Sequence, residues 1–201
     1  MSENANFKVD PRLASLLGET YRSTEHAVKE LVDNAWDADA PIISITLPDP
    51  MTANPIVIED KGTGMIEQEL RNEYIVVAND RRSRKGDRTK QLKRLVKGRK
   101  GIGKFAGLMV ANIMEIETTA RGKTTRVVIS KEDLLNASRD LERIDLPLTV
   151  APAAEGVLGT KVTLSSLSDR FAFPLPERLK SILMTEYGRE EDVQIRVNGE
   201  P

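Results

Sequence analysis

Three polar side chains recur at helical spacing within the segment ELVDNAWDA, namely Glu30, Asn34 and Asp37. At positions i, i+4 and i+7 they share one face of a helix. The amide oxygen of Asn34 suits a hard cation such as magnesium, and the carboxylate of Glu30 could accept a proton from water that attacks a phosphate. Taken alone, the pattern fits the polar face of an ordinary amphipathic helix better than it fits a site.

A second group follows the strand-like run PIVIE and reads Asp60-Lys61-Gly62-Thr63-Gly64-Met65. Its two glycines permit a positive φ and a close approach of the backbone to a ligand. The carboxylate of Asp60 could accept a hydrogen bond from an exocyclic amine such as that of adenine. Asp and Gly also dominate β-turns, so a plain turn is the simpler interpretation of this segment by itself.

The third group is GRKGIGKF, which runs from Gly98 to Phe105 and precedes an apolar stretch. Glycines that open a helix form a cradle of N–H groups for an anion. The pattern nearly matches the P-loop, but Phe105 stands where Ser or Thr would hold magnesium. The residues 91–97 before it are basic rather than a hydrophobic strand. These two departures exclude a P-loop NTPase and leave a phosphate-binding loop of another type.

The elements that position these groups follow from hydrophobic periodicity. A helix over 25–38 carries the first group, and strands over 42–47 and 55–59 lead to the second. Further helices are expected at 11–17, 66–76, 105–112 and 176–186, and further strands at 113–119, 124–129, 141–150, 161–164 and 193–197. Strands and helices do not alternate strictly, which predicts an α+β layer rather than a doubly wound sheet.

Twelve Lys and Arg residues lie between Arg81 and Lys104, against the single acid Asp87. This composition predicts an exposed segment rather than core. Such a cluster could also neutralise several phosphates of a nucleic acid, although it lacks the interleaved aromatic residues on which bases stack.

Composition narrows the class of protein. The chain has 201 residues, of which 39% are hydrophobic and 30% charged, and a net charge of -1. It contains no Cys and a single His, His26, which excludes disulfides and multi-histidine metal sites. The sequence has neither a membrane-spanning apolar run nor the apolar core of a signal peptide. We therefore expect a cytoplasmic protein.

The order of the motifs resembles the GHKL superfamily, which comprises DNA gyrase B subunits, ninety-kilodalton heat-shock chaperones, histidine kinases and MutL, with MORC proteins related. ELVDNAWDA looks like the family's N-box, DKGTGM its first glycine box, GRKGIGKFAG its second and GTKVTL its third. The resemblance covers about residues 20–164. It implies a two-layer Bergerat fold, with a mixed, mostly antiparallel sheet, helices on one face and a flexible lid over about 80–100.

The resemblance also implies an ATP site with magnesium. Glu30 would be the general base, Asn34 would ligate magnesium and Asp37 would support the site. Asp60 and Thr160 would bind the adenine. The remaining ATP-binding residues implied are Gly62, Gly64, Met65, Gly101, Ile102, Gly103, Lys104 and Phe105, the last five through their backbone N–H groups.

Glu30 favours the hydrolytic branches of the superfamily, because histidine kinases usually carry Asn there. The wording of the second glycine box looks closest to the MORC and chaperone types. We expect one ATP-binding domain over 1–201, an N-terminal fragment without the transducer domain that supplies a catalytic Lys or Arg. It would then hydrolyse ATP slowly and use nucleotide to close the lid and dimerise. The alternatives are a catalytically silent ATP switch and a nucleic-acid-binding module built on 81–104.

Overall fold

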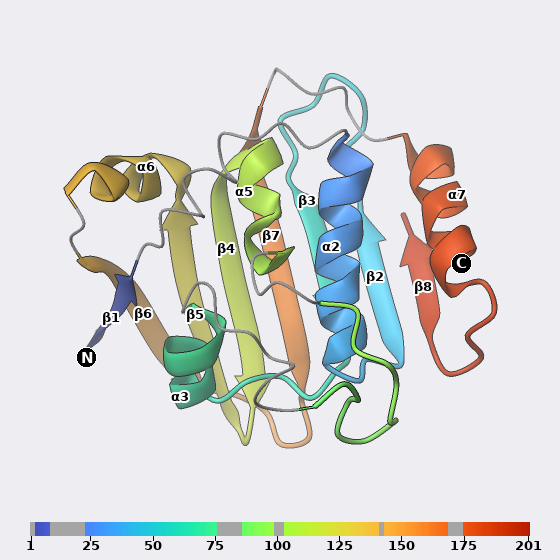
Figure 1. Ribbon diagram of the computed structural model, residues 1–201, viewed down its shortest axis with the longest axis horizontal. Helices are drawn as coiled ribbons and strands as arrows, with labels where there is room; N and C mark the ends of the chain where they lie inside the picture. Colours follow the sequence, from blue (N-terminus) through green and yellow to red (C-terminus); the bar gives the residue numbers. More distant parts are fainter. Residues whose placement is uncertain (1–2, 9–22, 76–85, 99–102, 141–142, 169–174) are drawn as a thin grey trace.

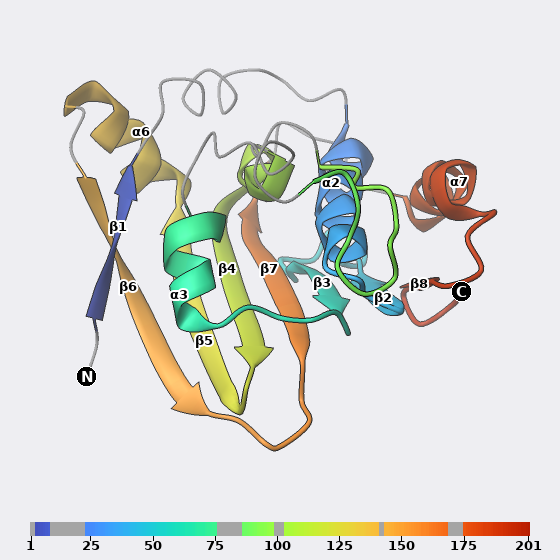
Figure 2. The ribbon, with the colours of Figure 1, turned by 60° about the horizontal axis from the view of Figure 1, so that its bottom comes forward.

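The computed structural model describes residues 3–8, 23–75, 86–98, 103–140, 143–168 and 175–201. An eight-stranded sheet forms one layer, in the order β1-β6-β5-β4-β7-β3-β2-β8. Only the pair β2–β8 is parallel, and the other neighbouring strands are antiparallel. The helices form a second layer on one face of this sheet (Figures 1 and 2). The predicted α+β fold, with a mixed and mostly antiparallel sheet, is therefore confirmed.

The strands are β1 (Glu3–Lys8), β2 (Ile42–Thr46), β3 (Ile56–Asp60), β4 (Ala111–Ala120), β5 (Lys123–Ser130), β6 (Arg143–Pro152), β7 (Gly159–Leu167) and β8 (Gln194–Val197). The helices are α2 (Thr24–Asp37), α3 (Glu67–Glu69), α5 (Gly107–Val110), α6 (Lys131–Asp140) and α7 (Pro176–Tyr187). The described residues also include a π-helical turn, η1 (Leu70–Tyr74), and a 3-10 turn, η2 (Gly103–Phe105).

Helix α2 lies along β3 and β2 and positions the first polar group (Figure 1). Its apolar stripe is almost completely buried, with Val28 and Val32 at 0% exposure and Leu31 at 3%. A stripe of this kind fixes the rotation of the helix about its own axis, because turning it would expose apolar area to water. The polar residues one turn apart on the flank, Glu30 and Asn34, are thereby held at the edge of the core.

The predicted helix over 105–112 is shorter in the structure. Helix α5 ends at Val110, and the next residue, Ala111, pairs with Leu167 of β7. The N–H of Ser168 also donates to the carbonyl of Val110 at 2.8 Å. Pairing with a neighbouring strand satisfies these backbone groups, which overrides the helical periodicity of the apolar run.

Two elements were not predicted, strand β1 and helix α6. Strand β1 has the sequence ENANFK, which carries little β-propensity, and it forms by antiparallel pairing with β6 from Glu3↔Leu148 to Lys8↔Arg143. Helix α6 begins with Glu132 and Asp133 in its first turn, a usual preference at a helix N-terminus. The predicted helix over 11–17 lies outside the described residues.

Within the described ranges, no helix has both the length and the apolar character that are needed to cross a bilayer.

Candidate functional site

One end of the candidate site is the polar flank of α2. A Cβ added to Gly103 would lie 2.3 Å from Oε2 of Glu30, and one added to Gly98 would lie 2.9 Å from Oδ2 of Asp37. Both distances are below a van der Waals contact, so a side chain in either place would have to displace the carboxylate of Glu30 or of Asp37. The structure thus brings two glycines of the second glycine box, Gly98 and Gly103, next to the polar residues of α2.

Asn34 lies between these two contacts, and its Oδ1 is 4.0 Å from the Cβ position of Gly98. Its Nδ2 is the buried side-chain polar atom that lacks a hydrogen-bond partner among the described residues. An orphaned buried donor costs about 1–3 kcal/mol, which a ligand oxygen would recover. A magnesium–phosphate group fits this donor set, because the carboxylate of Glu30 and the amide oxygen of Asn34 are hard oxygen ligands.

The other end of the candidate site is Asp60, at the end of β3. Its side chain is buried, and Oδ1 accepts from the N–H of Gly62 at 2.8 Å and from that of Thr160 at 3.3 Å. Burial raises the pKa of Asp60 to about 6, against the lowering effect of these two N–H donors. At neutral pH the carboxylate is therefore ionised and has its second oxygen, Oδ2, as a further acceptor.

The first glycine box closes tightly on the neighbouring strands. Gly64 has φ +61°, and a Cβ there would lie 2.0 Å from the carbonyl oxygen of Thr119. The next N–H, that of Met65, donates to Oγ1 of Thr118 at 2.9 Å. Thr118 also contacts the hydroxyl of Thr160 at 3.1 Å. The structure thus brings Met65, Thr160 and Asp60 together through these contacts.

Thr118 belongs to this group, and sequence reasoning did not single it out. One signal was present, because strand alternation places a hydroxyl on the same face as the apolar Met114 and Ile116. Which partners that hydroxyl meets depends on the register Thr118↔Thr160 between β4 and β7, which no local pattern contains.

The loop of the second glycine box is described only from Gly103, and Gly101 and Ile102 lie outside the described residues. The side chain of Phe105 is fully buried, with its ring 6.4 Å from that of Tyr74. The ammonium of Lys104 is buried too and donates to the carbonyl of Glu73 at 3.1 Å. Both side chains anchor the turn in the core, which leaves its backbone to face the site.

Residues 21–155 match the family of histidine kinase-, DNA gyrase B- and HSP90-like ATPases. The chain belongs to this family. It is also similar to the "Putative type II restriction enzyme HgiDII" of Herpetosiphon aurantiacus, with 31% identity over 139 residues. Those residues cover 69% of this chain and 22% of that protein, so the chain spans about a fifth of the length of this relative.

The part of the ATPase domain predicted as an exposed lid is described over 86–98. Most of its residues are exposed, as the charge pattern predicted, but three of them pack into the domain. Thr89, Arg94 and Val96 are buried. The carboxylate of Asp37 accepts from the N–H of Lys97 at 2.9 Å and from that of Gly98 at 3.0 Å. Asp37 therefore holds the start of the second glycine box, which is a more direct role than general support of the site.

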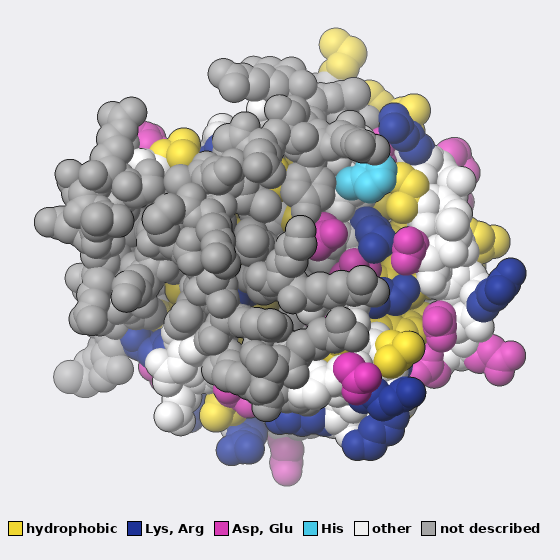
Figure 3. Space-filling model, viewed as in Figure 1, with side chains coloured by type: hydrophobic (Ala, Val, Ile, Leu, Met, Phe, Trp, Pro, Cys, Tyr) yellow, Lys and Arg dark blue, Asp and Glu magenta, His cyan; other side chains and the backbone are white. Residues whose placement is uncertain are grey.

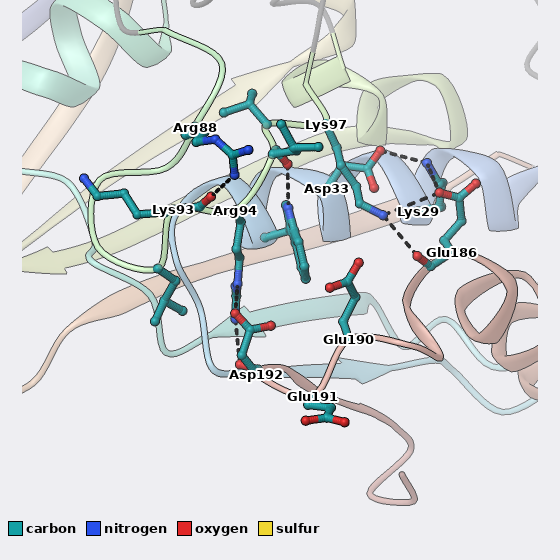
Figure 4. A pocket seen from close by; sticks show the side chains of 14 residues that line it. Lys29, Asp33, Arg88, Lys93, Arg94, Lys97, Glu186, Glu190, Glu191 and Asp192 are labelled. Atoms are coloured by element: carbon teal, nitrogen blue, oxygen red, sulfur yellow. Dashed lines mark hydrogen bonds and ion pairs between the residues drawn. The ribbon is translucent and has the colours of Figure 1, made fainter.

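Arg94 explains why this cationic segment can pack on the domain (Figure 4). Its guanidinium lies 4.3 Å from the ring centroid of Trp36, donates to the carbonyl of Ala40 at 2.9 Å and pairs with Asp192 at 2.8 Å. A buried Arg is tolerated where all of its donors are used and an aromatic face covers it. The expected exposure therefore holds for most of the segment but not for Arg94, because the pattern of charges along the chain does not contain these partners.

The hollow between this segment and the α7–β8 connection has a volume of about 770 Å³. Its lining mixes both signs, with Lys29, Lys97 and Arg94 facing Glu186 and Asp192 (Figure 4). Cationic and anionic side chains also alternate over the described right-hand part of the face in Figure 3. A large single-sign patch is therefore not a property of the described residues on this face.

Proposed function

We propose that this ATPase domain binds ATP with magnesium and hydrolyses it to ADP. The observation that carries the proposal is the placement of Glu30 and Asn34 directly against the glycines of the second box, with Gly103 at Glu30 and Gly98 beside Asn34. A carboxylate beside a phosphate-binding loop is positioned to take a proton from an attacking water. The buried amide of Asn34 supplies both an oxygen and a donor at the same place.

The adenine would bind at the opposite end, between Asp60 and Thr160. The ionised carboxylate of Asp60 accepts from the exocyclic amine, and Gly62 and Gly64 let the loop after β3 pack closely on the neighbouring backbone beside it. Magnesium, when bound, neutralises the charge that develops on the phosphates. The backbone N–H groups of 101–105 would hold the triphosphate between the two ends.

The direct test replaces Glu30 by Gln. Phosphate release should fall by at least about 100-fold because the proton acceptor is lost, while the affinity for a non-hydrolysable ATP analogue should stay within about threefold, because Gln keeps the size and polarity of the side chain. Asn34→Ala should instead remove the magnesium dependence of binding, which is measured by calorimetric titration with and without the cation.

The matched control is Glu132→Gln, which changes an exposed glutamate on α6. It should leave turnover and binding unchanged. Turnover that survives Glu30→Gln would refute the assignment of Glu30 as the base. Loss of both turnover and binding would give Glu30 a structural role, and binding without any turnover in the unaltered chain would favour a silent ATP switch.

We also propose that nucleotide closes the segment over about 80–100 and drives dimerisation. The support is the direct bond of Asp37 to the backbone of 97–98, three residues along α2 from Asn34. Light scattering with and without the ATP analogue and magnesium tests this, and an unchanged molar mass would refute dimerisation.

Nucleic-acid binding through 81–104 is a second candidate function. The similarity to a protein named as a putative type II restriction enzyme is the observation that favours it. Against it, Arg94 and Lys97 are already engaged with acids and aromatic rings of the domain itself. A filter-binding assay with duplex DNA at increasing salt decides, since phosphate contacts through this segment require binding at low salt that falls steeply as salt rises.

A further inference from the structure

The hydroxyl of Thr118 lies at the junction of the first and third glycine boxes. Its side chain is 0% exposed, and its Oγ1 has three polar neighbours, namely the N–H of Met65 at 2.9 Å, the hydroxyl of Thr160 at 3.1 Å and the carbonyl of Gly159 at 3.3 Å. The sheet register places Thr118, Thr160 and Asp60 side by side on β4, β7 and β3. One buried group therefore contacts the loop after β3 and also the residue next to the base pocket.

A hydroxyl has one proton to donate and two lone pairs to accept. The N–H of Met65 donates to one lone pair of Thr118. The single hydroxyl proton of Thr118 can then be donated either to the carbonyl of Gly159 or to the hydroxyl of Thr160. If Thr118 donates to Gly159, Thr160 must donate its own proton to Thr118. The Thr160 hydroxyl can then only accept a hydrogen bond from a bound base. If Thr118 donates to Thr160, the proton of Thr160 turns toward the pocket. The contact with Thr160 is the shorter of the two, which favours the second arrangement.

In that arrangement the pocket shows an acceptor, the Asp60 carboxylate, beside a donor, the Thr160 hydroxyl. The edge of adenine is complementary, because its exocyclic amine donates and the neighbouring ring nitrogen accepts. Guanine has the reverse order, with an accepting oxygen beside a donating ring N–H. A water that bridges Thr160 to the base would relay the same polarity.

We propose that Thr118 is a positioning residue that sets the direction of the Thr160 hydrogen bond and thereby makes the site select adenine over guanine nucleotides. This rests on the proposed function, since it names the base that the same site accepts. A merely structural Thr118 would hold the Met65 loop and affect both nucleotides alike. A positioning role and a structural role therefore predict different ratios of adenine-nucleotide to guanine-nucleotide affinity when Thr118 is replaced.

The test is calorimetric titration with non-hydrolysable ATP and GTP analogues plus magnesium. Thr118→Val keeps the shape and removes the hydroxyl, and it should lower the ratio of ATP to GTP affinity by about tenfold, the effect of one hydrogen bond that can no longer discriminate. Thr118→Ser should restore the ratio. The control is Thr125→Val, because Thr125 is 1% exposed, pairs with Thr118 in the ladder and should leave the ratio unchanged when altered.

An unchanged ratio in Thr118→Val, or equal losses for both nucleotides, would overturn the proposal while ATP binding by the unaltered chain still stands. An unaltered chain that binds neither analogue would overturn the proposed function and this inference together. If Thr118→Val does not fold, Thr118→Cys decides, because its thiol is a weak donor of similar size. It should give an intermediate ratio, and a ratio equal to that of the unaltered chain contradicts the proposal.

Discussion

The buried carboxylate of Asp60 lowers the stability of the unliganded protein at neutral pH. A carboxylate at 8% exposure loses most of its hydration, and two backbone N–H donors replace only part of it. The pKa of about 6 measures that deficit, since burial outweighs both hydrogen bonds. The ionised form at neutral pH is therefore a destabilising group in the unliganded protein, and a ligand that donates to it would offset the cost.

We predict that Asp60→Asn stabilises the unliganded protein and weakens ATP binding. The folded pKa is raised from 3.8 to about 6, so the folded state keeps a proton that the unfolded chain has lost between these values. Stability of the unaltered chain thus falls as pH rises from about 4 to about 6. A shift of about two pH units corresponds to about 3 kcal/mol, which is the upper limit of the gain at pH 7.5.

Urea unfolding at pH 7.5 and pH 4 checks this prediction, and the gain from Asp60→Asn should vanish at the lower pH. ATP affinity should fall at least about tenfold, because the amide cannot replace a charged acceptor. Glu132→Gln is the control, since that side chain on α6 is exposed, does not contribute to the raised pKa of Asp60 and should show neither effect. A gain that is the same at both pH values would contradict the assigned pKa.

At the scale of elements, the loop after β3 and the first residue of β7 lie so close to neighbouring backbone that glycine is required at both places. A Cβ on Gly159 would lie 2.1 Å from the carbonyl oxygen of Asp60, and one on Gly64 would lie 2.0 Å from that of Thr119. Both glycines also have a positive φ, +133° and +61°. The neighbouring atoms are backbone, which cannot move aside as a flexible side chain can.

Gly64→Ala should therefore destabilise the protein more than a positive φ alone would. The matched control is Gly122→Ala, because Gly122 has φ +71° with open space around its Cβ position. The control should cost about 1–2 kcal/mol for the left-handed conformation, whereas Gly64→Ala adds the displacement of a strand carbonyl and should also reduce ATP affinity. Equal unfolding free energies for the two variants would show that the close contact is relieved without cost.

At the scale of the whole molecule, one network of contacts joins the 86–98 segment to α2 and to the α7–β8 connection. Arg94 connects it to the α7–β8 connection through Asp192, which is 98 residues away. The indole N–H of Trp36 donates to the carbonyl of Leu95 at 2.9 Å. Nearby, the hydroxyl of Tyr187 on α7 donates to Asp33 on α2, and burial with the charge of Asp33 raises the pKa of that hydroxyl.

Arg94→Lys should lower the unfolding free energy by about 1–3 kcal/mol, because an ammonium cannot make the planar fork of hydrogen bonds and would leave the buried carbonyl of Ala40 without its donor. Arg126→Lys is the control. Arg126 also pairs with a carboxylate, that of Glu115 at 2.6 Å, but its side chain is 48% exposed, so the control should cost less than about 1 kcal/mol. Similar losses in urea unfolding for both variants would contradict the buried role of Arg94.

The sequence by itself determined what depends on neighbours along the chain. The periodicity of Val28, Leu31 and Val32 predicted α2 and the face that carries Glu30 and Asn34, and the glycine boxes in their order predicted the family that the match over 21–155 confirms. These signals are local, because helix rotation and turn conformation are set within a few residues. The roles of the site residues stay predictions until binding and turnover are measured.

Only the tertiary structure decided which distant residues meet. The contact of Thr118 with Thr160 joins residues 42 apart and depends on strand register, and a one-residue slip would turn Thr118 to the other face. The burial of Arg94 likewise depends on an acid and an aromatic ring from other elements. Composition predicted an exposed segment and could not predict that Arg94 is buried. The free energy of a charge is set by its partners in space rather than by its neighbours in sequence.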